Sequence, residues 1–258
     1  MEIIFEKTVA AFSLGVLIFF IIFCIQPFKF FYRRARLSLV ITLWQIVISP
    51  FGQVKFRHFF LADILTSMTQ PLRDLGYISC FFFQGSWLDQ SDPSVEQCPL
   101  LEDYILSVAF LPFWFRLAQC FRRYYDCKQR VHLINAGKYF SVILVHFTNV
   151  LRVKVQSNET MALFILMSFA SSCYSYCWDI YMDWGLLRAP WSDPEKALLR
   201  PKILFPKWFY YYAAASNLVL RFLWVLPFIP MIITIPHWKL ATQGLLIIVT
   251  VGEGFRRA

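Results

Sequence analysis

The chain has 258 residues, of which 58% are hydrophobic and 19% aromatic, and its mean hydropathy is +0.53. A soluble domain of this length has no use for so much apolar surface, so the composition indicates a polytopic membrane protein. The net charge of +9 would suggest nucleic acid in a soluble protein, but here Lys and Arg cluster beside apolar runs and no aromatic-basic groove is evident. We therefore expect no nucleic-acid partner, and we assign the basic residues to orientation and to contact with membrane lipids.

Apolar runs long enough to cross a bilayer predict an all-α bundle of about seven transmembrane helices. The first run is too long for a signal-peptide core and no small-residue cleavage site follows it, so we interpret it as a retained span. Leu37–Phe51 is short for a crossing, which suggests an interfacial or re-entrant helix. We expect an N-terminal helix over residues 1–27 and a larger transmembrane domain over 28–258. The predicted spans are 8–27, 59–84, 104–121, 138–153, 160–180, 209–233 and 240–256.

Charges in the connections predict the orientation of these spans. The connections 28–58, 122–137 and 181–208 are basic and fall on one side of the seven-span arrangement, whereas Asp89–Asp103 on the other side has no Lys or Arg. Because cytosolic loops are enriched in Lys and Arg, the basic side is predicted to be cytosolic and the N-terminus outside or lumenal. The sequon Asn158–Thr160 would then lie on the outer side, in a loop so short that we expect it to be unmodified.

Two acids, Asp179 and Asp183, end a long apolar run. Their i, i+4 spacing predicts that both carboxylates lie on one face of an α-helix. A charge at membrane depth costs roughly 2.5–3.5 kcal/mol on insertion scales, so it is kept where it faces a polar pathway or where a cation neutralises it. The pair therefore marks a candidate functional region.

Further charged and polar residues fall within the other predicted spans. Asp63 opens a polar stripe along the second span, and the predicted bundle supplies cations from several helices. Structural Asp–Arg pairs between helices explain any single residue equally well. The whole set favours a polyvalent anion, because Arg forks match phosphate oxygens and Lys adds a point charge. The stripe is Asp63, Thr66, Ser67, Gln70 and Asp74, and the cations are Arg116, Lys138, Arg221, Arg256 and Arg257.

The seven cysteines do not form a disulfide framework or a metal site. Cys173 and Cys177 share a helix face, but no His or second Cys pair completes a zinc set. We expect no metal and no cofactor.

Six segments, taken in order, resemble the EXS domain family. Their order and spacing match over roughly residues 28–257. They are Phe59–Ser67, Phe115–Tyr124, His132–Tyr139, Trp178–Leu186, Leu220–Trp224 and Glu253–Arg257. The family includes phosphate exporters of the xenotropic and polytropic retrovirus receptor type, plant phosphate exporters and a shorter Golgi branch. The resemblance implies that inorganic phosphate passes through the helix bundle and that Trp224 is the gating aromatic. The residues it implies along the path are Asp63, Thr66, Lys138, Tyr139, Asp179, Asp183, Arg221, Arg256 and Arg257, and we add Arg116 to the phosphate-binding set.

The sequence departs from the exporters in two ways. No SPX domain precedes the helices, which leaves a homodimer and an SPX-domain protein acting in trans as open partner assignments. The sequence also stops after Arg257, where the family continues, as expected of a truncated product, a fragment or a short branch. The resemblance implies the Golgi or the plasma membrane.

Two other function classes compete with phosphate transport. A Golgi sorting or retention scaffold is the alternative, although a scaffold has little need of an Arg–Lys cluster at membrane depth. A membrane enzyme is disfavoured, because the chain lacks the longer acid set of membrane phosphotransferases and the Gly-x-Gly-Asp of intramembrane aspartyl proteases. We expect no enzymatic activity.

Overall fold

The computed structural model describes residues 2–26, 28–29, 31–69, 71–73, 75–76, 99–187, 199, 203–229, 244–245, 247–249 and 251–254. In this part of the chain the regular elements are all helical, which confirms the predicted all-α class. Contacts divide the chain into two compact units, Met1–His146 and Phe147–Ala258.

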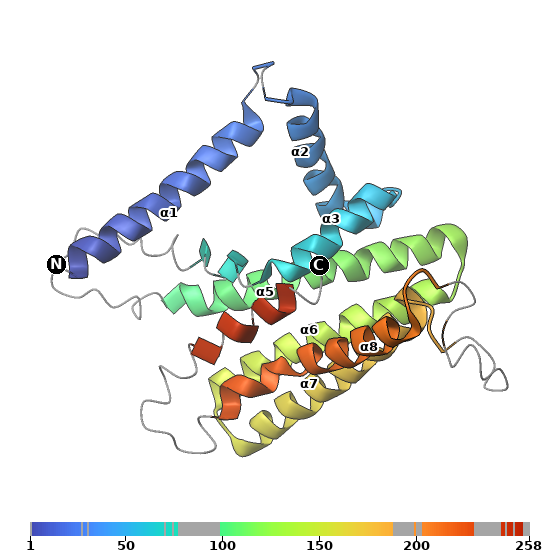
Figure 1. The fold of residues 1–258 in the computed structure, drawn as a ribbon. Helices are drawn as coiled ribbons and strands as arrows, with labels where there is room; N and C mark the ends of the chain where they lie inside the picture. Colours follow the sequence, from blue (N-terminus) through green and yellow to red (C-terminus); the bar gives the residue numbers. More distant parts are fainter. Residues whose placement is uncertain are drawn as a thin grey trace. The chain divides into compact units, whose positions relative to one another are not determined.

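The first unit is built around the long helix α5. Helix α1 contacts α2, α2 packs against α3, and both α3 and the short turn η1 pack against α5 (Figure 1). The helix α6 follows, and its first part, through His146, belongs to this unit. The elements are α1 (Glu2–Ile25), α2 (Arg33–Val47), η1 (Ser49–Phe51), α3 (Phe56–Ser67), α5 (Pro99–Cys127) and α6 (Val131–Val155).

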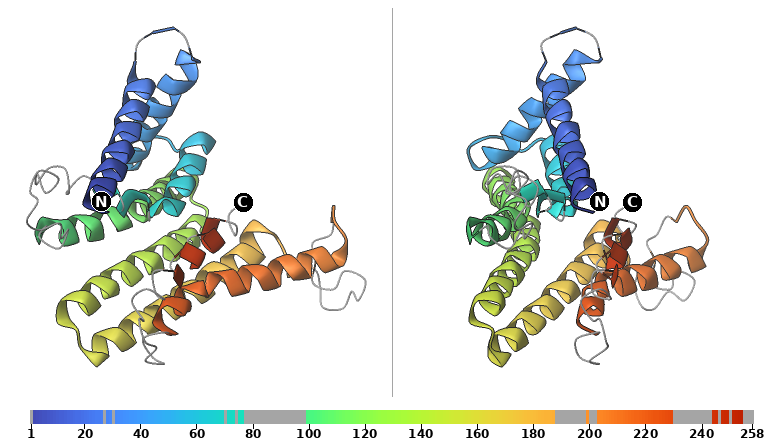
Figure 2. Two further views of the ribbon diagram at one scale, coloured as in Figure 1. Left: turned by 60° about the vertical axis from the view of Figure 1, so that its left-hand side comes forward. Right: turned by 90° about the vertical axis from the view of Figure 1, so that its left-hand side faces the viewer.

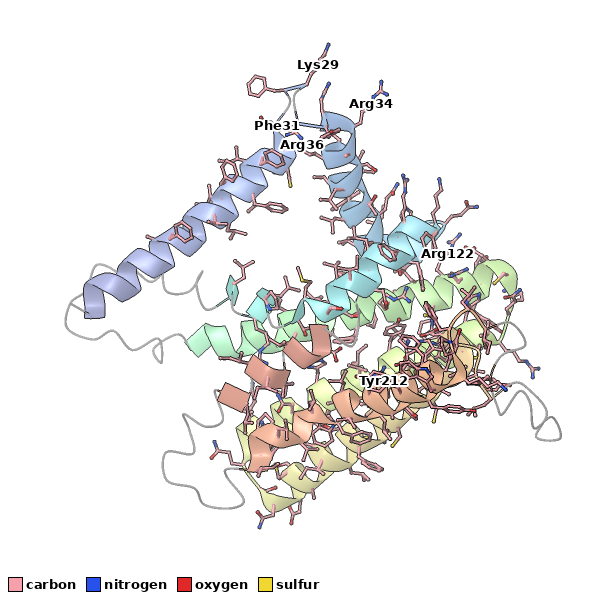
Figure 3. All side chains as sticks on the ribbon, in the orientation of Figure 1. Lys29, Phe31, Arg34, Arg36, Arg122 and Tyr212 are labelled. Atoms are coloured by element: carbon pink, nitrogen blue, oxygen red, sulfur yellow. The ribbon has the colours of Figure 1, made fainter. Side chains whose placement is uncertain are left out.

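Arg36 fixes the turn between α1 and α2. Its guanidinium donates hydrogen bonds to the carbonyl oxygens of Phe23 and Phe28, the latter at 3.0 Å, and lies 5.2 Å from the centre of the Phe23 ring. Lys29 and Arg34 instead point outward at the tip of this turn (Figure 3). The buried arginine therefore joins the two helices, whereas the exposed cations remain available to solvent or lipid headgroups.

The core of the first unit lies between α5 and α6. Phe113, Leu117 and Cys120 recur at helical spacing along α5 and pack against Ala136 and Tyr139 of α6. This spacing places the three α5 residues on one face of the helix. Tyr139 is thus part of the core and also a member of the predicted site.

The second unit pairs two helices. Figures 1 and 2 show α7 and α8 side by side, and contacts join them. Ser157 begins α7 as its N-cap, because its Oγ accepts the backbone N–H of Thr160 at 3.2 Å. The elements after α6 are α7 (Asn158–Trp178), the π-helical turn η3 (Asp179–Asp183), α8 (Lys207–Arg221) and η4 (Leu223–Phe228).

Within the described residues, one helical stretch, the 26-residue Asn158–Asp183, is both long and apolar enough to cross a membrane. Leu14–Ile25 forms a shorter apolar helix. The count of seven spans therefore stays a prediction.

Two helices end earlier than the predicted spans 59–84 and 209–233. Helix α3 ends at Ser67 and α8 at Arg221. In an α-helix, the ring of a proline clashes with the carbonyl group of the residue four positions earlier. Pro71 would clash in this way with Ser67, and Pro227 with Leu223. Helix α3 carries Asp63, Thr66 and Ser67 of the predicted polar stripe, and the other members, Gln70 and Asp74, lie outside the described residues.

Candidate functional site: two polar clusters

The first cluster brings together Asp63 of α3, Arg116 and Gln119 of α5, and Tyr139 of α6. The Tyr139 hydroxyl donates to Asp63 Oδ1 at 3.0 Å and accepts from Arg116 Nε at 3.0 Å and from Nη2 at 2.8 Å. Arg116 Nε also lies 3.4 Å from Asp63 Oδ1, and its Nη1 donates to Gln119 Oε1 at 2.9 Å. Three predicted site residues from three helices thus meet in one hydrogen-bonded network.

Burial differs sharply between the two charges of this cluster. The Arg116 side chain is 2% exposed, and its guanidinium lies 4.1 Å from the centre of the Phe59 ring and 4.8 Å from that of Tyr139. The Asp63 side chain is 47% exposed. The enclosed guanidinium therefore holds Asp63 and Tyr139 in position, while the carboxylate opens to the surroundings.

The other predicted members of the first unit lie beside this network. Thr66 is buried, and its Oγ1 donates to the backbone carbonyl of Asp63 at 2.7 Å, a local helix contact. The half-buried Lys138 places its ammonium 4.9 Å from the centre of the Tyr139 ring. Tyr139 thus has cations at its ring as well as at its hydroxyl.

His58 contacts the first cluster through its backbone. Its backbone carbonyl accepts from Gln119 Nε2 at 3.2 Å. Burial, together with the neighbouring charges of Arg57 and Lys55, lowers the pKa of the imidazole, so it is neutral at pH 7. A neutral ring suits this place near the start of α3, because the positive end of the helix dipole disfavours a cation there.

The second cluster joins the ends of α7 and α8. Arg221 Nη2 donates to Asp179 Oδ2 in an ion pair, and Asn217 Nδ2 donates to the same oxygen at 3.1 Å. The side chains of Arg221 and Asp179 are 15% and 13% exposed. Asp179 is therefore neutralised by a cation from the neighbouring helix, as expected for an acid at the end of an apolar run.

Asp179 and Asp183 begin and end a π-helical turn, not a continuation of α7 as an α-helix. In this turn the Trp184 N–H donates to the Asp179 carbonyl at 2.8 Å. Asp183 Oδ1 accepts from Trp178 Nε1 at 3.0 Å. The shared face of the two carboxylates stays a prediction. Such π-helical turns inside helices are frequent at functional sites.

Trp224 lies on η4, just beyond the end of α8 at Arg221. Its Nε1 donates to Ser172 Oγ of α7 at 3.0 Å. Its ring packs edge-on against Phe164 and Phe228, with centroid distances of 6.4 Å in both cases. The residue thus contacts the neighbouring helix. Arg256 and Arg257 lie outside the described residues.

Sequence reasoning missed three partners in these clusters, namely Asn217, Gln119 and Ser172. Helical spacing could have found two of them, since Asn217 precedes Arg221 by four residues and Gln119 follows Arg116 by three. Nothing in the sequence distinguishes Ser172 as a hydrogen-bond partner from the other serines of α7.

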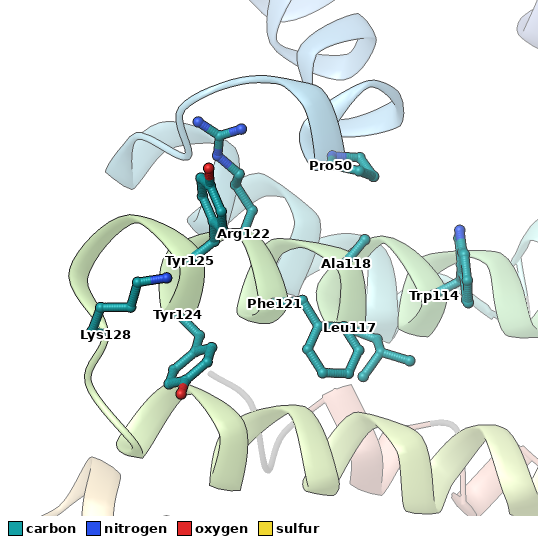
Figure 4. Close-up of a pocket in the computed structure, with 9 residues that line it drawn as sticks. All are labelled: Pro50, Trp114, Leu117, Ala118, Phe121, Arg122, Tyr124, Tyr125 and Lys128. Atoms are coloured by element: carbon teal, nitrogen blue, oxygen red, sulfur yellow. The ribbon is translucent and has the colours of Figure 1, made fainter.

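A surface hollow of about 690 Å³ lies along α5, separate from the first cluster (Figure 4). One end is apolar, with Trp114 and Leu117, and the other carries Arg122 and Lys128. None of the predicted phosphate-binding residues lines it. Among the described residues, no three His, Cys, Asp or Glu side chains gather as metal ligands.

The family model for the EXS family matches residues 3–258. The chain belongs to the EXS family. The SPX and EXS domain-containing protein 1 of Dictyostelium discoideum is 38% identical over 224 residues, which is 83% of this chain and 23% of that protein. The phosphate transporter PHO1 homolog 1 of Arabidopsis thaliana is 35% identical, over 81% of this chain and 26% of its own length. The xenotropic and polytropic retrovirus receptor 1 homolog of Danio rerio is 36% identical, over 81% of this chain and 32% of its own length.

This EXS chain therefore spans about a quarter to a third of the length of these relatives. The family and the named relatives identify it as a membrane protein. The resemblance predicted from the six ordered segments is confirmed.

Proposed function

We propose that this chain transports inorganic phosphate across a membrane and that the polar cluster of each unit contacts the anion on its way. The observation that carries the proposal is that both units hold an Arg–Asp pair with further hydrogen-bond donors: Tyr139 beside Arg116 and Asp63, and Asn217 beside Arg221 and Asp179. Two plant relatives are named as phosphate transporters, which supports the same substrate.

The chemistry of these clusters suits a divalent or monovalent oxyanion. A guanidinium offers a planar fork of N–H donors to phosphate oxygens, and hydroxyl and amide groups add neutral donors. The carboxylates neutralise the cations while no anion is present. They also weaken anion binding, and conduction requires that the anion can leave as well as enter.

The two arginines take different roles in this proposal. Arg116 is enclosed, so it positions Asp63 and Tyr139, and the half-exposed Asp63 and half-buried Lys138 face the anion. Arg221 pairs with Asp179 and binds the anion directly. The remaining proposed members are Thr66, Asp183, Arg256 and Arg257, with Trp224 as the gate.

Several finer features belong to the same proposal. Phosphate moves outward or from lumen to cytosol, in the plasma membrane or the Golgi. Membrane lipids, a second copy of the chain and an SPX-domain protein in trans are its proposed partners. The transporter names of the relatives fit a protein that is not an enzyme.

The test is radioactive phosphate flux into liposomes that contain the purified chain. Phosphate uptake that saturates with concentration and exceeds that of empty liposomes is expected. A chain that inserts but carries no phosphate would overturn the proposal and would favour the Golgi retention scaffold.

A further inference from the structure

Arg152 is a half-buried arginine near the end of α6, and the predicted phosphate set does not include it. Its Nε and Nη2 donate to Asn149 Oδ1 at 3.2 and 2.9 Å. Its guanidinium lies 5.1 Å from the centre of the Phe164 ring and 5.9 Å from that of Phe228. Asn149 and two aromatic rings therefore hold this guanidinium in one orientation.

Arg152 differs from Arg116 and Arg221 in having no acid. Those two arginines pair with Asp63 and Asp179, whereas no carboxylate pairs with Arg152 anywhere in the part of the chain that the structure describes. The two aromatic faces attract the guanidinium, but they carry no net charge and do not neutralise it.

The orientation also argues against a merely snorkelling side chain. A snorkelling arginine extends toward the membrane surface. The Arg152 guanidinium instead turns back to Asn149, one turn earlier on the same helix, and packs against Phe164. Within the described residues its Nη1 takes part in no hydrogen bond, so that edge of the fork retains its donors for an anion.

Helix α7 gives the separation between Arg152 and Arg221. Arg152 contacts Phe164, Trp224 bonds to Ser172, and Arg221 pairs with Asp179, so the three contacts follow one another along α7. At 1.5 Å rise per residue, the outer two contacts are about 22 Å apart along the helix. Trp224, Phe164 and Phe228 pack against one another between them, with ring centroids 5.9–6.4 Å apart.

We propose that Arg152 forms a second anion-binding subsite, which holds inorganic phosphate on the opposite side of Trp224 from Arg221. This inference rests on the proposed phosphate transport. An anion that passes the aromatic cluster then leaves one guanidinium and meets another. Arg152 binds the anion after it has passed the aromatic cluster, because within the described residues no carboxylate competes for the donors on Nη1.

The test compares phosphate uptake by liposomes containing the whole chain with Arg152→Gln, Arg152→Lys or the control Lys154→Gln, an exposed cation two residues away. Clefts lined by one sign of charge raise association rates by about 10- to 1,000-fold, so Arg152→Gln is expected to raise the half-saturating phosphate concentration about tenfold at low salt. The difference should shrink at high salt because ions screen the charge. Arg152→Lys should lie in between, and Lys154→Gln should resemble the unmodified chain.

Three outcomes separate the possible failures. If the unmodified chain carries no phosphate, phosphate transport and this inference fail together. If it carries phosphate and Arg152→Gln saturates at the same concentration, or loses rate equally at all phosphate and salt concentrations, only the second subsite is overturned. If Arg152→Gln does not fold, Asn149→Ala, which releases the guanidinium but keeps its charge, is expected to raise the half-saturating concentration two- to threefold, about 0.5 kcal/mol. An unchanged value there also overturns the subsite.

Discussion

Arg221, the last residue of α8, shares one carboxylate oxygen of Asp179 with Asn217, four residues earlier on the same helix. Asp179 follows directly after α7 and begins the π-helical turn. Because Arg221 and Asn217 both donate to this oxygen, they fix the position of α8 along the axis of α7. The same contacts keep a guanidinium at the boundary between the two helices, where we propose that it binds phosphate.

Asp179→Asn is expected to destabilise the protein, because it leaves Arg221 without its counter-charge. Removing one partner of a buried ion pair costs about 3–5 kcal/mol. Thermal unfolding in detergent should show a clear drop in melting temperature. Asp126→Asn is the matched control, because it breaks the exposed pair with Arg122, and such pairs contribute about 0–1 kcal/mol. Equal melting temperatures for the two variants would show that the Asp179 pair is not important for stability.

Tyr139→Phe removes the hydroxyl that links Arg116 to Asp63, so phosphate flux is expected to fall with the protein still inserted. Combined with Asp63→Asn in a double-mutant cycle, it should show a coupling free energy of about 0.5–3 kcal/mol, as for residues in one network. Tyr125→Phe, a change at a tyrosine that is 67% exposed, serves as the control. Additive effects of the Tyr139 and Asp63 changes would mean that the hydroxyl does not link the two charges.

Trp224→Ala is expected to raise the basal phosphate leak without changing the anion preference, because an aromatic constriction blocks by bulk and by excluding water. Trp224→Phe keeps a ring but loses the bond to Ser172, so a smaller leak is expected. Flux is measured without and with competing anions, and Trp208→Ala, at a site 66% exposed, is the control. Reduced flux with normal expression would indicate that Trp224 supports packing or an open path.

Cys127 and Cys98 test the predicted orientation. Cys127 is exposed at the end of α5, next to basic residues, and is expected to react from the cytosolic side. Cys98 lies in the acidic loop and is expected to react from the opposite side. Labelling with a membrane-impermeant thiol reagent in intact and permeabilised cells measures both. Reaction of both residues from the same side would reject the arrangement.

Residue types and spacing predicted the helical class, and they marked Asp63, Arg116 and Asp179 as charges in apolar segments that need partners. They did not predict which partners meet. Arg116 pairs with Asp63 because α3 packs against α5, a tertiary relation that helical periodicity does not contain.

Backbone details explain the remaining differences. An α-helix was expected at Asp179 and Asp183, and the structure has a π-helical turn there. The helix ends at Ser67 and Arg221 could have been predicted from Pro71 and Pro227, which stand shortly beyond them.

The most direct measurement of the central claim is phosphate flux through Arg221→Ala in liposomes, compared with the unmodified chain. Hydrogen bonds to charged groups contribute about 1.5–3 kcal/mol, which corresponds to a decrease of about tenfold or more. Arg221→Lys should restore only part of the flux, because a point charge does not replace the guanidinium fork. Arg34→Ala, which removes an exposed cation from the turn between α1 and α2, should leave the flux unchanged. If Arg221→Ala inserts normally and carries phosphate at the rate of the unmodified chain, the account is contradicted.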